Sequence, residues 1–359
     1  MNVIHLVTNR AWGGGERYVL DLCRTLRADG HRVDVLTRRK SAPREIFEAE
    51  GLRKGTIGPG GPLDILSPVR LARHLRGIEG EAIVHVHNFK DAATAEAARK
   101  LLPDPGRIRI VCTRHLVKPA PTEQSRVGVL AALDAIIFVS DKARQVFLST
   151  NPAIDNARLH TVHNSIPDPG RAESSRPADA LGPVKILYVG RISPEKGVDT
   201  LIRSLGKIST LPWTAEICGT GQARHVMPLM RMARELGIAD RIDWPGHVSE
   251  PLRRMASADI IVLPTRAPEA FGLTLLEAMS QGVPVVTTDN GAQPEIITDS
   301  IEGLLVAPDD PQAMADALRR LAESPTLRRD IGERGRETFA GRFGYDRFYN
   351  DIIDIYHGH

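Results

Sequence analysis

The chain has 359 residues, which is long enough for two domains that each bury their own core. Hydrophobic residues make up 42% and charged residues 25% of it, an ordinary composition for a soluble globular protein. The longest apolar runs, at 135–139 and 260–264, are too short to cross a bilayer. No basic segment leads an apolar one at the N-terminus, so we expect no secretion signal.

The net charge of +3 conceals an asymmetry between the two halves of the chain. Residues 1–168 carry 25 basic and 18 acidic side chains, and the remainder carries 22 and 26. A basic first half suits an anionic membrane surface or substrate, and it is equally typical of a solvated, arginine-rich surface. We therefore expect a cytoplasmic protein, with the inner face of the membrane as an alternative location and no nucleic-acid partner.

Three cysteines, Cys23, Cys112 and Cys218, lie far apart in the sequence, each beside apolar residues. An odd number without an export signal predicts buried thiols in a reducing compartment. Their spacing matches no metal-binding pattern.

The first half alternates β-branched stretches with longer amphipathic ones, which predicts parallel strands joined by helices. Residues 15–30 predict a helix that ends at Gly30. The predicted strands lie at 2–7, 32–37, 82–87, 108–113, 134–140 and 158–163. These elements predict an N-terminal domain over residues 1–168.

Residues 169–182 are rich in Pro, Ser, Gly and charge, which predicts a linker. A second alternating series predicts a C-terminal domain over residues 183–340. Its strands are expected at 184–190, 215–221, 241–246, 259–264, 284–289 and 303–308. Residues 341–359 predict a final helix that can pack back on the N-terminal domain. The predicted fold class is α/β, with two Rossmann-like, doubly wound parallel-sheet domains facing a central cleft at the strand carboxyl ends.

Two carboxylates flank a predicted helix start in the second half. Glu269 follows a strand, and Glu277 lies inside the helix that begins near Phe271, Gly272 and Leu273. The free amides of a helix N-terminus attract phosphate, and carboxylates accept hydrogen bonds from sugar hydroxyls. An isolated pair of this kind is as well explained by a solvated helix residue and a loop residue near a dipole.

Two cations, Arg191 and Lys196, lie five positions apart in the loop after the first strand of the second domain. Such a pair suits a diphosphate, although surface cations are the alternative, and we expect Lys196 to face solvent. Gly219 and Gly221 allow close backbone approach but form a weak motif by themselves. His247 ends a strand, where its backbone is of more interest than its ring.

Three glycines at 13–15 separate the first strand from the first helix. Gly13 and Gly15 match the start of a dinucleotide-binding motif, and the cations after the second strand suit a 2′-phosphate. Tyr18 is too bulky for the third glycine position, which makes a dehydrogenase the weaker hypothesis. The glycine-rich helix start suits a phosphate in either case.

Three histidines end neighbouring strands of the first domain. His85 and His87 alternate along one strand and therefore point the same way, and one of them is expected to be a hydrogen-bonded core residue. His115 follows its strand and is better placed to face the cleft. Neither a Ser-His-Asp arrangement nor a zinc motif is present.

Together these stretches resemble the retaining family-four glycosyltransferases of GT-B architecture, over nearly the whole chain. The resemblance rests on "GGGERYVLDL", "VGRISPEKG", "CGTGQ", "PGHV", "PEAFGLTLLEAMSQGVPVV" and "GAQPEI". The most specific feature is the Glu-x7-Glu spacing around Phe-Gly, preceded by the Arg and Lys in the family's order.

The resemblance implies a UDP-, GDP- or ADP-sugar donor bound mainly by the second domain. Glu269 would contact the transferred sugar, Glu277 the ribose, and the backbone near His247 and Val248 the base. Arg191 and Lys196 would bind the diphosphate and, with Glu269 and His115, are the implied catalytic residues. The remaining implied donor residues are Gly219, Phe271, Gly272, Leu273 and Thr274 in the second domain and Gly14 and Gly15 in the first. His115 matches the family's histidine beside the reacting carbon.

The implied reaction is hexosyl transfer to a hydroxyl acceptor with retention, in cell-surface glycan or glycolipid synthesis. The leaving phosphate would deprotonate the acceptor, domain closure would complete the site, and neither a metal nor a cofactor would be needed. Asn164-Ser165 departs from the family's usual Asn-Gly, and the acceptor region (12–17 and 38–60) matches nothing diagnostic. A nucleotide-sugar epimerase or hydrolase and a non-catalytic binding subunit are the alternatives.

Overall fold

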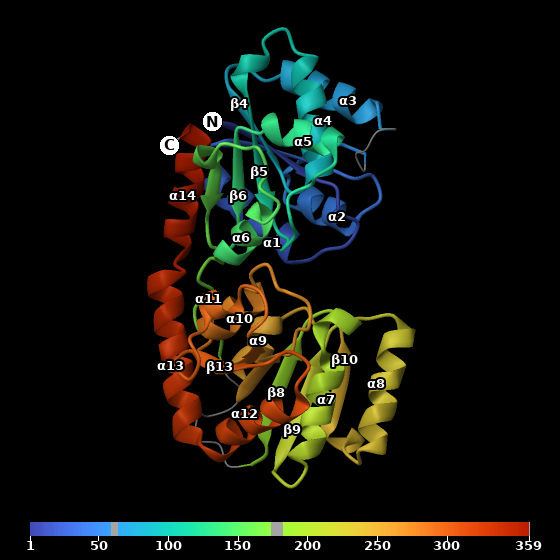
Figure 1. Cartoon of the computed structure of the whole chain (residues 1–359), viewed down its shortest axis with the longest axis vertical. Helices are drawn as coiled ribbons and strands as arrows, with labels where there is room; N and C mark the ends of the chain where they lie inside the picture. The colour runs from blue at the N-terminus through green and yellow to red at the C-terminus, as the bar shows by residue number, and fades with distance from the viewer. Residues whose placement is uncertain (59–63, 174–181, 359) are drawn as a thin grey trace. The chain divides into compact units, whose positions relative to one another are not determined.

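The computed structural model describes residues 1–58, 64–173 and 182–358, which form two compact units. The N-terminal unit comprises Met1–Asn164 and Asp346–His359, and the C-terminal unit comprises Ser165–Tyr345. Each unit contains one fully parallel sheet with helices packed against it (Figure 1). The predicted fold class of two Rossmann-like α/β domains is confirmed. Most of the predicted linker, residues 174–181, lies outside the described part of the chain.

The sheet of the N-terminal unit has the strand order β3-β2-β1-β4-β5-β6-β7. Its strands are β1 (Asn2–Val7), β2 (Arg32–Thr37), β3 (Arg53–Thr56), β4 (Ala82–Val86), β5 (Ile108–Arg114), β6 (Ala135–Phe138) and β7 (Leu159–Thr161). In the parallel register between β1 and β4, His5 lies opposite His85. This register aligns the two imidazoles across neighbouring strands.

Polar residues begin several helices of this unit. The side chains of Ser41, Asn88 and Ser140 each accept a hydrogen bond from a backbone amide three residues ahead, as expected of N-caps. Gly30 has a left-handed φ of +80°, as the predicted helix end requires. The helices are α1 (Gly14–Ala28), α2 (Ala42–Ala49), α3 (Leu66–Arg76), α4 (Phe89–Lys100), α5 (Gln124–Ala131) and α6 (Asp141–Leu148), with 3₁₀ turns at Pro105–Arg107 and Asn156–Arg158.

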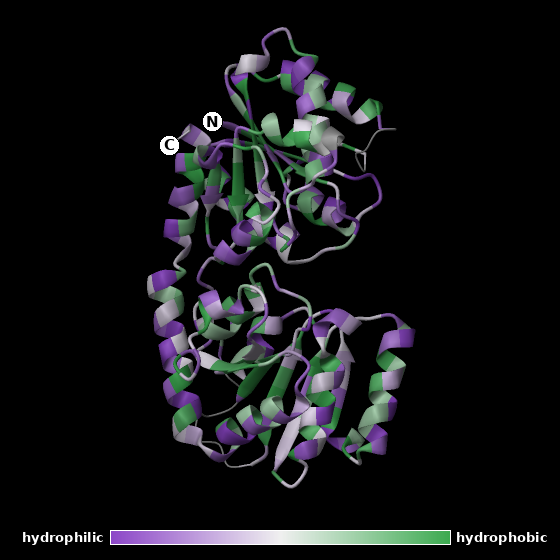
Figure 2. Ribbon diagram, in the orientation of Figure 1, coloured by the Kyte–Doolittle hydropathy of each residue, from purple (hydrophilic) through white to green (hydrophobic). Residues whose placement is uncertain are grey.

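The strands alternate between two buried faces. Ile4 and Leu6 of β1 and Val84 and Val86 of β4 pack into an apolar core with α3, α4 and α5. The intervening residues, including His5 and His85, point to the opposite face. Both faces are covered, which explains why these strands are almost wholly apolar (Figure 2).

Strand β3 was not predicted from the sequence. Its four residues, "RKGT", are polar or glycine and show no apolar run. It lies at the edge of the sheet and pairs only with β2 among the described strands. Edge strands commonly carry charged residues that discourage pairing with another chain, and this conceals them from a search for apolar stretches.

The sheet of the C-terminal unit has the order β10-β9-β8-β11-β12-β13. Its core is built on the buried rings of Tyr188 and Trp213, together with aliphatic residues of α7 and α12. The strands are β8 (Val184–Val189), β9 (Trp213–Cys218), β10 (Ile242–Gly246), β11 (Ile260–Leu263), β12 (Val285–Thr288) and β13 (Gly303–Val306). All six overlap the strands expected from the sequence.

The described part of this unit contains seven helices: α7 (Val198–Lys207), α8 (Ala223–Glu235), α9 (Pro251–Ala256), α10 (Leu273–Ser280), α11 (Gln293–Ile296), α12 (Pro311–Glu323) and α13 (Pro325–Arg342). Short 3₁₀ turns lie at Pro194–Lys196 and Ala239–Arg241. No helix among the described residues is long and apolar enough to cross a membrane.

The last helix, α14 (Tyr345–His357), packs on the N-terminal unit. Tyr356 and the Nδ1 atom of His85 share a hydrogen bond of 2.6 Å, 271 positions apart in the chain. Phe348 packs edge-on against Tyr18 of α1, with 5.3 Å between the ring centroids. At the surface, the Tyr349 hydroxyl donates to Asp29 over 2.8 Å. The helix therefore covers the sheet face that carries the histidines.

The three cysteines are buried and free, as expected from the sequence. Burial raises the pKa of the Cys112 thiol to about 12 and that of Cys218 to about 11. Both therefore remain protonated and unreactive at neutral pH.

We predict that Tyr356→Phe destabilises the N-terminal unit by about 1–3 kcal/mol, because it leaves a buried imidazole nitrogen without its partner. Tyr349→Phe is the matched control. It also removes one tyrosine hydroxyl, but from an exposed hydrogen bond, so it should cost less than about 0.5 kcal/mol. Amide hydrogen exchange of β4 and α14 measures both changes. Equal protection in the two variants would contradict this account of α14 docking.

Candidate functional site

Arg191 and Lys196 lie in the loop between β8 and α7, at the carboxyl edge of the C-terminal sheet. Arg191 is exposed, and its carbonyl accepts a hydrogen bond of 2.6 Å from the Tyr188 hydroxyl. Lys196 ends a short 3₁₀ turn immediately before α7. The two cations thus lie on one loop, as the sequence predicted.

Lys196 forms an ion pair with Glu269, which lies in the loop after β11. The two side chains are 19% and 18% exposed, so the expectation that Lys196 faces solvent is only partly met. The Thr265 hydroxyl donates to the same carboxylate oxygen over 2.9 Å. A cation and a carboxylate separated by 73 positions in sequence therefore meet at one edge of the sheet.

Backbone contacts hold the loops that carry these two side chains together. The Glu195 carbonyl accepts hydrogen bonds from the amides of Arg266 and Ala267. Gly197 has a φ of +65°, and a Cβ atom there would lie 1.9 Å from the carbonyl oxygen of Pro264. Only glycine allows this approach, which places Lys196 beside Glu269.

Glu269 also contacts the segment after β12. It forms an isolated parallel bridge with Gly291, and its carbonyl accepts from the Ala292 amide over 3.0 Å. Gly291 has a φ of +93° and leaves no room for a side chain against the Glu269 backbone. The "GAQPEI" motif therefore has a structural role in holding this glutamate.

Helix α10 begins beside Glu269. Phe271 is buried, and Gly272 precedes the helix with a φ of +97° that favours glycine. Leu273 and Thr274 form the first turn, where the amides have no partner within the helix. Glu277 is half-buried one turn further on and shares a helix face with Leu273. The helix start, Lys196 and Glu269 offer amides, a cation and a carboxylate to one ligand.

Gly219 has a packing role that the sequence did not reveal. Its φ is +147°, and a Cβ atom would lie 1.7 Å from the carbonyl oxygen of Gly190. Gly221 makes a similarly close approach to Ile192. These contacts pair the end of β9 with the loop that carries Arg191, so they explain both glycines without a ligand.

His247 and Val248 line a cavity of about 680 Å³ beside α9. The other residues that line it come mainly from β8, β9 and α9, including Lys185 and Glu216. None of the four charged residues predicted for the donor, Arg191, Lys196, Glu269 and Glu277, is among the described residues that line this cavity. The structure thus does not place the predicted base site and the ion pair in one cavity.

In the N-terminal unit, Gly14 is the first residue of α1, and Gly15 packs against His115. A Cβ atom at Gly15 would lie 3.7 Å from the His115 ring, which is ordinary contact. Tyr18, one turn along α1, packs edge-on against the same ring with 4.9 Å between centroids. The residues predicted to contact the donor in this unit are therefore neighbours.

Three histidines form a hydrogen-bonded row across β1, β4 and β5. His5 Nδ1 lies 3.2 Å from His87 Nε2, and His87 Nδ1 lies 3.2 Å from His115 Nε2. A neutral imidazole has one donor and one acceptor nitrogen, so the tautomer of each ring fixes that of the next. His87 thereby determines which nitrogen of His115 carries the proton.

The fourth histidine, His85, has the core role expected for one member of this group. Its Nδ1 bonds to Tyr356 and its Nε2 lies 2.7 Å from the Thr113 hydroxyl. Nitrogens of His5, His85 and His87 lie within 4.8 Å of one another, close enough for one metal ion. Both His85 nitrogens, His5 Nδ1 and His87 Nε2 are engaged in hydrogen bonds, whereas the buried His5 Nε2 has no partner among the described residues. The arrangement is better explained as a buried network than as a metal site.

Burial keeps these imidazoles neutral. It lowers the pKa of His5 to about 3 and that of His115 to about 4, because the charged form loses its hydration. The pKa values of His85 and His87 are lowered by burial and by repulsion from the other rings. At neutral pH His115 can therefore accept or donate a hydrogen bond, and it carries no charge.

Two residues of this region were missed in the sequence. His5 lies within an apolar strand and shows no motif. Asp91, in the first turn of α4, is buried and accepts hydrogen bonds from Thr8 and Asn88. Burial raises its pKa to about 7, and those two donors oppose the rise. A lone Asp after an Asn cap suggests only capping, so no pattern in the sequence distinguishes it.

With this geometry in view, two family models account for most of the chain. Residues 12–168 match Glycosyltransferase Family 4, and residues 171–338 match Glycosyl transferases group 1. The chain belongs to the family-four glycosyltransferases. The suspected resemblance is thus confirmed.

Curated relatives of this glycosyltransferase are 26% to 30% identical to it over the residues that match. An exopolysaccharide phosphotransferase of Streptomyces coelicolor is 30% identical over 81% of this chain and 29% of its own length. A D-inositol 3-phosphate glycosyltransferase of Saccharomonospora viridis is 30% identical over 77% of this chain and 64% of its own length. The chain therefore spans less than two thirds of either relative.

Solved structures share the whole fold. Anabaena Alr3699/HepE in complex with UDP has a TM-score of 0.86 and 19% identity, with all of both chains covered. A glycosyltransferase from Rickettsia africae has a TM-score of 0.85 and 20% identity over 99% of this chain and 98% of its own. At these identities the likeness establishes the GT-B fold of this glycosyltransferase.

We predict that Gly197→Ala destabilises the C-terminal unit by about 1–3 kcal/mol more than Gly237→Ala. The two glycines have nearly the same left-handed φ, +65° and +66°, but no atom lies within 4 Å of a Cβ atom at Gly237. The strain of a left-handed alanine is therefore the same in both variants, and the difference between them measures the contact of the added Cβ atom with Pro264. Urea unfolding monitored by the fluorescence of Trp213 and Trp244 provides the measurement, and equal losses would exclude the close approach.

We also predict that the N-terminal unit loses stability as the pH falls from 7 to 5. Unfolded histidine titrates near 6.5, whereas the four folded imidazoles have lowered pKa values, so acid protonates the unfolded chain first. Each histidine then contributes a loss of up to about 1.4 kcal/mol per pH unit. Burial raises the pKa values of Asp91 and Asp21, which has the opposite sign, but these are two groups against four.

Hydrogen exchange of β4 and β5 at several pH values measures this loss. His5→Leu should reduce the slope, because one buried imidazole is removed, whereas His225→Gln on α8 of the other unit should leave it unchanged. A wild-type stability that does not change between pH 7 and 5 would contradict the prediction.

Proposed function

We propose that this protein transfers a sugar from a nucleotide-diphospho-sugar to a hydroxyl acceptor, with retention of anomeric configuration. The observation that carries the proposal is the pairing of Lys196 with Glu269 beside the start of α10. The cation and the helix terminus match the diphosphate of such a donor, and the carboxylate matches the hydroxyls of its sugar.

Each donor group is assigned a partner in the C-terminal unit. Arg191 and Lys196 bind the diphosphate, with the amides from Phe271 to Thr274 as further donors. Glu269 exchanges its bond with Lys196 for the hydroxyls of the transferred sugar. Glu277 accepts from the ribose, and the backbone of His247 and Val248 holds the base.

In the N-terminal unit, Gly14 and Gly15 provide backbone amides for the donor phosphates, and His115 contacts the donor beside the reacting carbon. The bond between the anomeric carbon and the leaving diphosphate oxygen breaks while the acceptor oxygen bonds to that carbon on the same face. The acceptor proton passes to the leaving diphosphate, whose negative charge Arg191 and Lys196 stabilise. Cations of the protein serve in place of a metal ion in this scheme.

Proteins of the same fold support a nucleotide-sugar donor. Anabaena Alr3699/HepE is described in complex with UDP, with UDP and glucose, and with UDP-glucose. Several relatives are named D-inositol 3-phosphate glycosyltransferases. We propose a hexosyl donor, a role in glycan or glycolipid synthesis, and a cytoplasmic location that includes the inner membrane face.

Product analysis tests the proposal against its alternatives. NMR of the purified protein with a panel of UDP-, GDP- and ADP-sugars and hydroxyl acceptors should show a new glycoside with the donor's anomeric configuration. Formation of a 2-epimer or a free sugar alone would favour an epimerase or hydrolase. Binding without turnover across the panel would favour a non-catalytic subunit.

We predict that Lys196→Ala lowers kcat/KM about 10²–10³-fold, because the developing charge on the diphosphate loses one cation. Lys207→Ala on α7 is the control, since it removes an exposed lysine close in sequence without touching the ion pair. Thermal unfolding of both variants shows whether the fold is retained. An unchanged kcat/KM in folded Lys196→Ala would refute the diphosphate assignment.

A further inference from the structure

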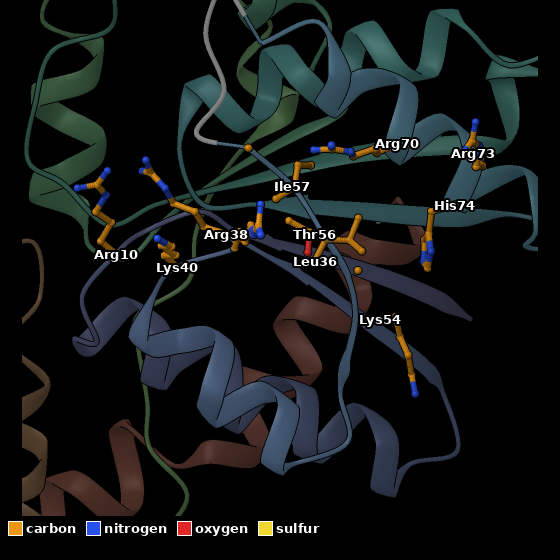
Figure 3. A pocket seen from close by; sticks show the side chains of 13 residues that line it. Arg10, Leu36, Arg38, Lys40, Lys54, Thr56, Ile57, Arg70, Arg73 and His74 are labelled. Atoms are coloured by element: carbon orange, nitrogen blue, oxygen red, sulfur yellow. The ribbon is translucent and has the colours of Figure 1, made fainter.

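The N-terminal unit contains a cavity of about 860 Å³ that the proposed donor site does not use. It lies between the ends of β2 and β3 and helix α3 (Figure 3). Leu36 and Ile57 form its apolar part, and Gly55, Thr56 and Gly58 supply backbone along one side. We call this cavity the basic pocket.

Cations surround the basic pocket. Of the thirteen described residues that line it, seven are Lys or Arg and none is Asp or Glu. They come from four separate parts of the sequence: Arg10, Arg38 to Lys40, Lys54, and Arg70 with Arg73. Figure 3 shows Arg10, Arg38 and Lys40 gathered at one end, while Arg70 reaches from α3 toward Ile57. The tertiary fold brings the local run from Arg38 to Lys40 together with four cations from other parts of the sequence.

These cations differ from other arginines of the same unit. Arg24 pairs with Glu50 and Arg99 pairs with Asp134. Among the described residues, no ion pair is formed by any of the seven cations of the basic pocket. The nearby carboxylate of Asp34 does not line the cavity; it bonds to His74 over 2.9 Å and also attracts Lys54. Such an excess of cations around a hollow raises the local concentration of anions.

The position of the basic pocket relates it to the reaction. In a parallel sheet all carboxyl ends lie at one edge, so the ends of β2 and β3 share an edge with His115 after β5. Three strand spacings separate β2 from β5, or about 14 Å. An acceptor with its anionic group in the pocket and its hydroxyl beside His115 would therefore have to span about 14 Å.

We propose that the basic pocket binds a phosphate or diphosphate group on the acceptor. Arginine forks and point-charge lysines converging from several directions suit a tetrahedral oxyanion, which presents oxygens on all sides. That the bound molecule is an acceptor rests on the proposed glycosyl transfer. Binding of the anion by the pocket does not depend on catalysis. It also gives a role to the "TRRK" cations, which the donor-binding residues leave unexplained.

Titration with inorganic diphosphate tests the pocket directly. Calorimetry uses the full chain carrying Lys196→Ala, which weakens binding at the proposed donor site. Adding Arg38→Gln and Arg70→Gln should then weaken diphosphate binding at least about 10-fold, because two charge-assisted contacts are lost. The matched control adds Lys100→Gln and Lys118→Gln, exposed cations of the same unit outside the pocket. Equal affinity in the two backgrounds would overturn the proposal.

A second arm identifies the source of the anion, using the otherwise wild-type chain. It compares a soluble sugar phosphate with phosphatidylcholine vesicles that contain a polyprenyl diphosphate. Binding of either that is lost in Arg38→Gln/Arg70→Gln supports the pocket and names its source. Binding of neither would overturn an acceptor role.

The two hypotheses fail in different ways. If donor turnover is observed but the paired substitution changes neither diphosphate binding nor the KM for acceptor, the pocket proposal is wrong and glycosyl transfer stands. If the paired substitution abolishes diphosphate binding but no donor is turned over, the site stands and the proposed transfer fails.

Discussion

The part of the candidate site that lies in the C-terminal unit depends on one close approach of two backbones. Where Gly197 passes the carbonyl of Pro264, a single added carbon would lie 1.9 Å from that oxygen. The Glu195 carbonyl fastens the same crossing by accepting two amides from the opposite loop. Because the loops are fixed there, Lys196 and Glu269 meet although they are distant in sequence. The ion pair therefore forms because the residue at position 197 is a glycine, which allows the two loops to approach.

In the N-terminal unit the histidines are positioned by strand register, as Lys196 and Glu269 are positioned by the glycine in the other unit. Parallel pairing of β1 with β4 sets His5 opposite His85, and the alternation of the strand brings His87 to the same face. Among the described residues, these rings form hydrogen bonds with one another, with Thr113 and with Tyr356 in a buried layer. Such a layer is stable while the imidazoles are neutral, which their lowered pKa values ensure.

Much of this could be predicted from the sequence, because the relevant information was local. Apolar runs located twelve of the thirteen strands that the structure describes, and the Glu-x7-Glu spacing identified Glu277 of α10 and Glu269 of the loop before it. The remainder depended on contacts between distant residues. "RKGT" forms an edge strand through pairing with β2 that its composition does not suggest. The pairing of Lys196 with Glu269 and the cations of the basic pocket exist only once the loops are brought together.

The packing of α14 on the N-terminal unit has a consequence for biosynthesis. Domains generally fold as units while the chain is made, N-terminal first. Here the hydroxyl that satisfies His85 belongs to a helix made after the entire C-terminal unit, 271 residues later. Until α14 leaves the ribosome, the histidine-bearing face of the sheet stays open to water or to chaperones. The N-terminal unit is therefore the first to be synthesised and the last to complete its folding.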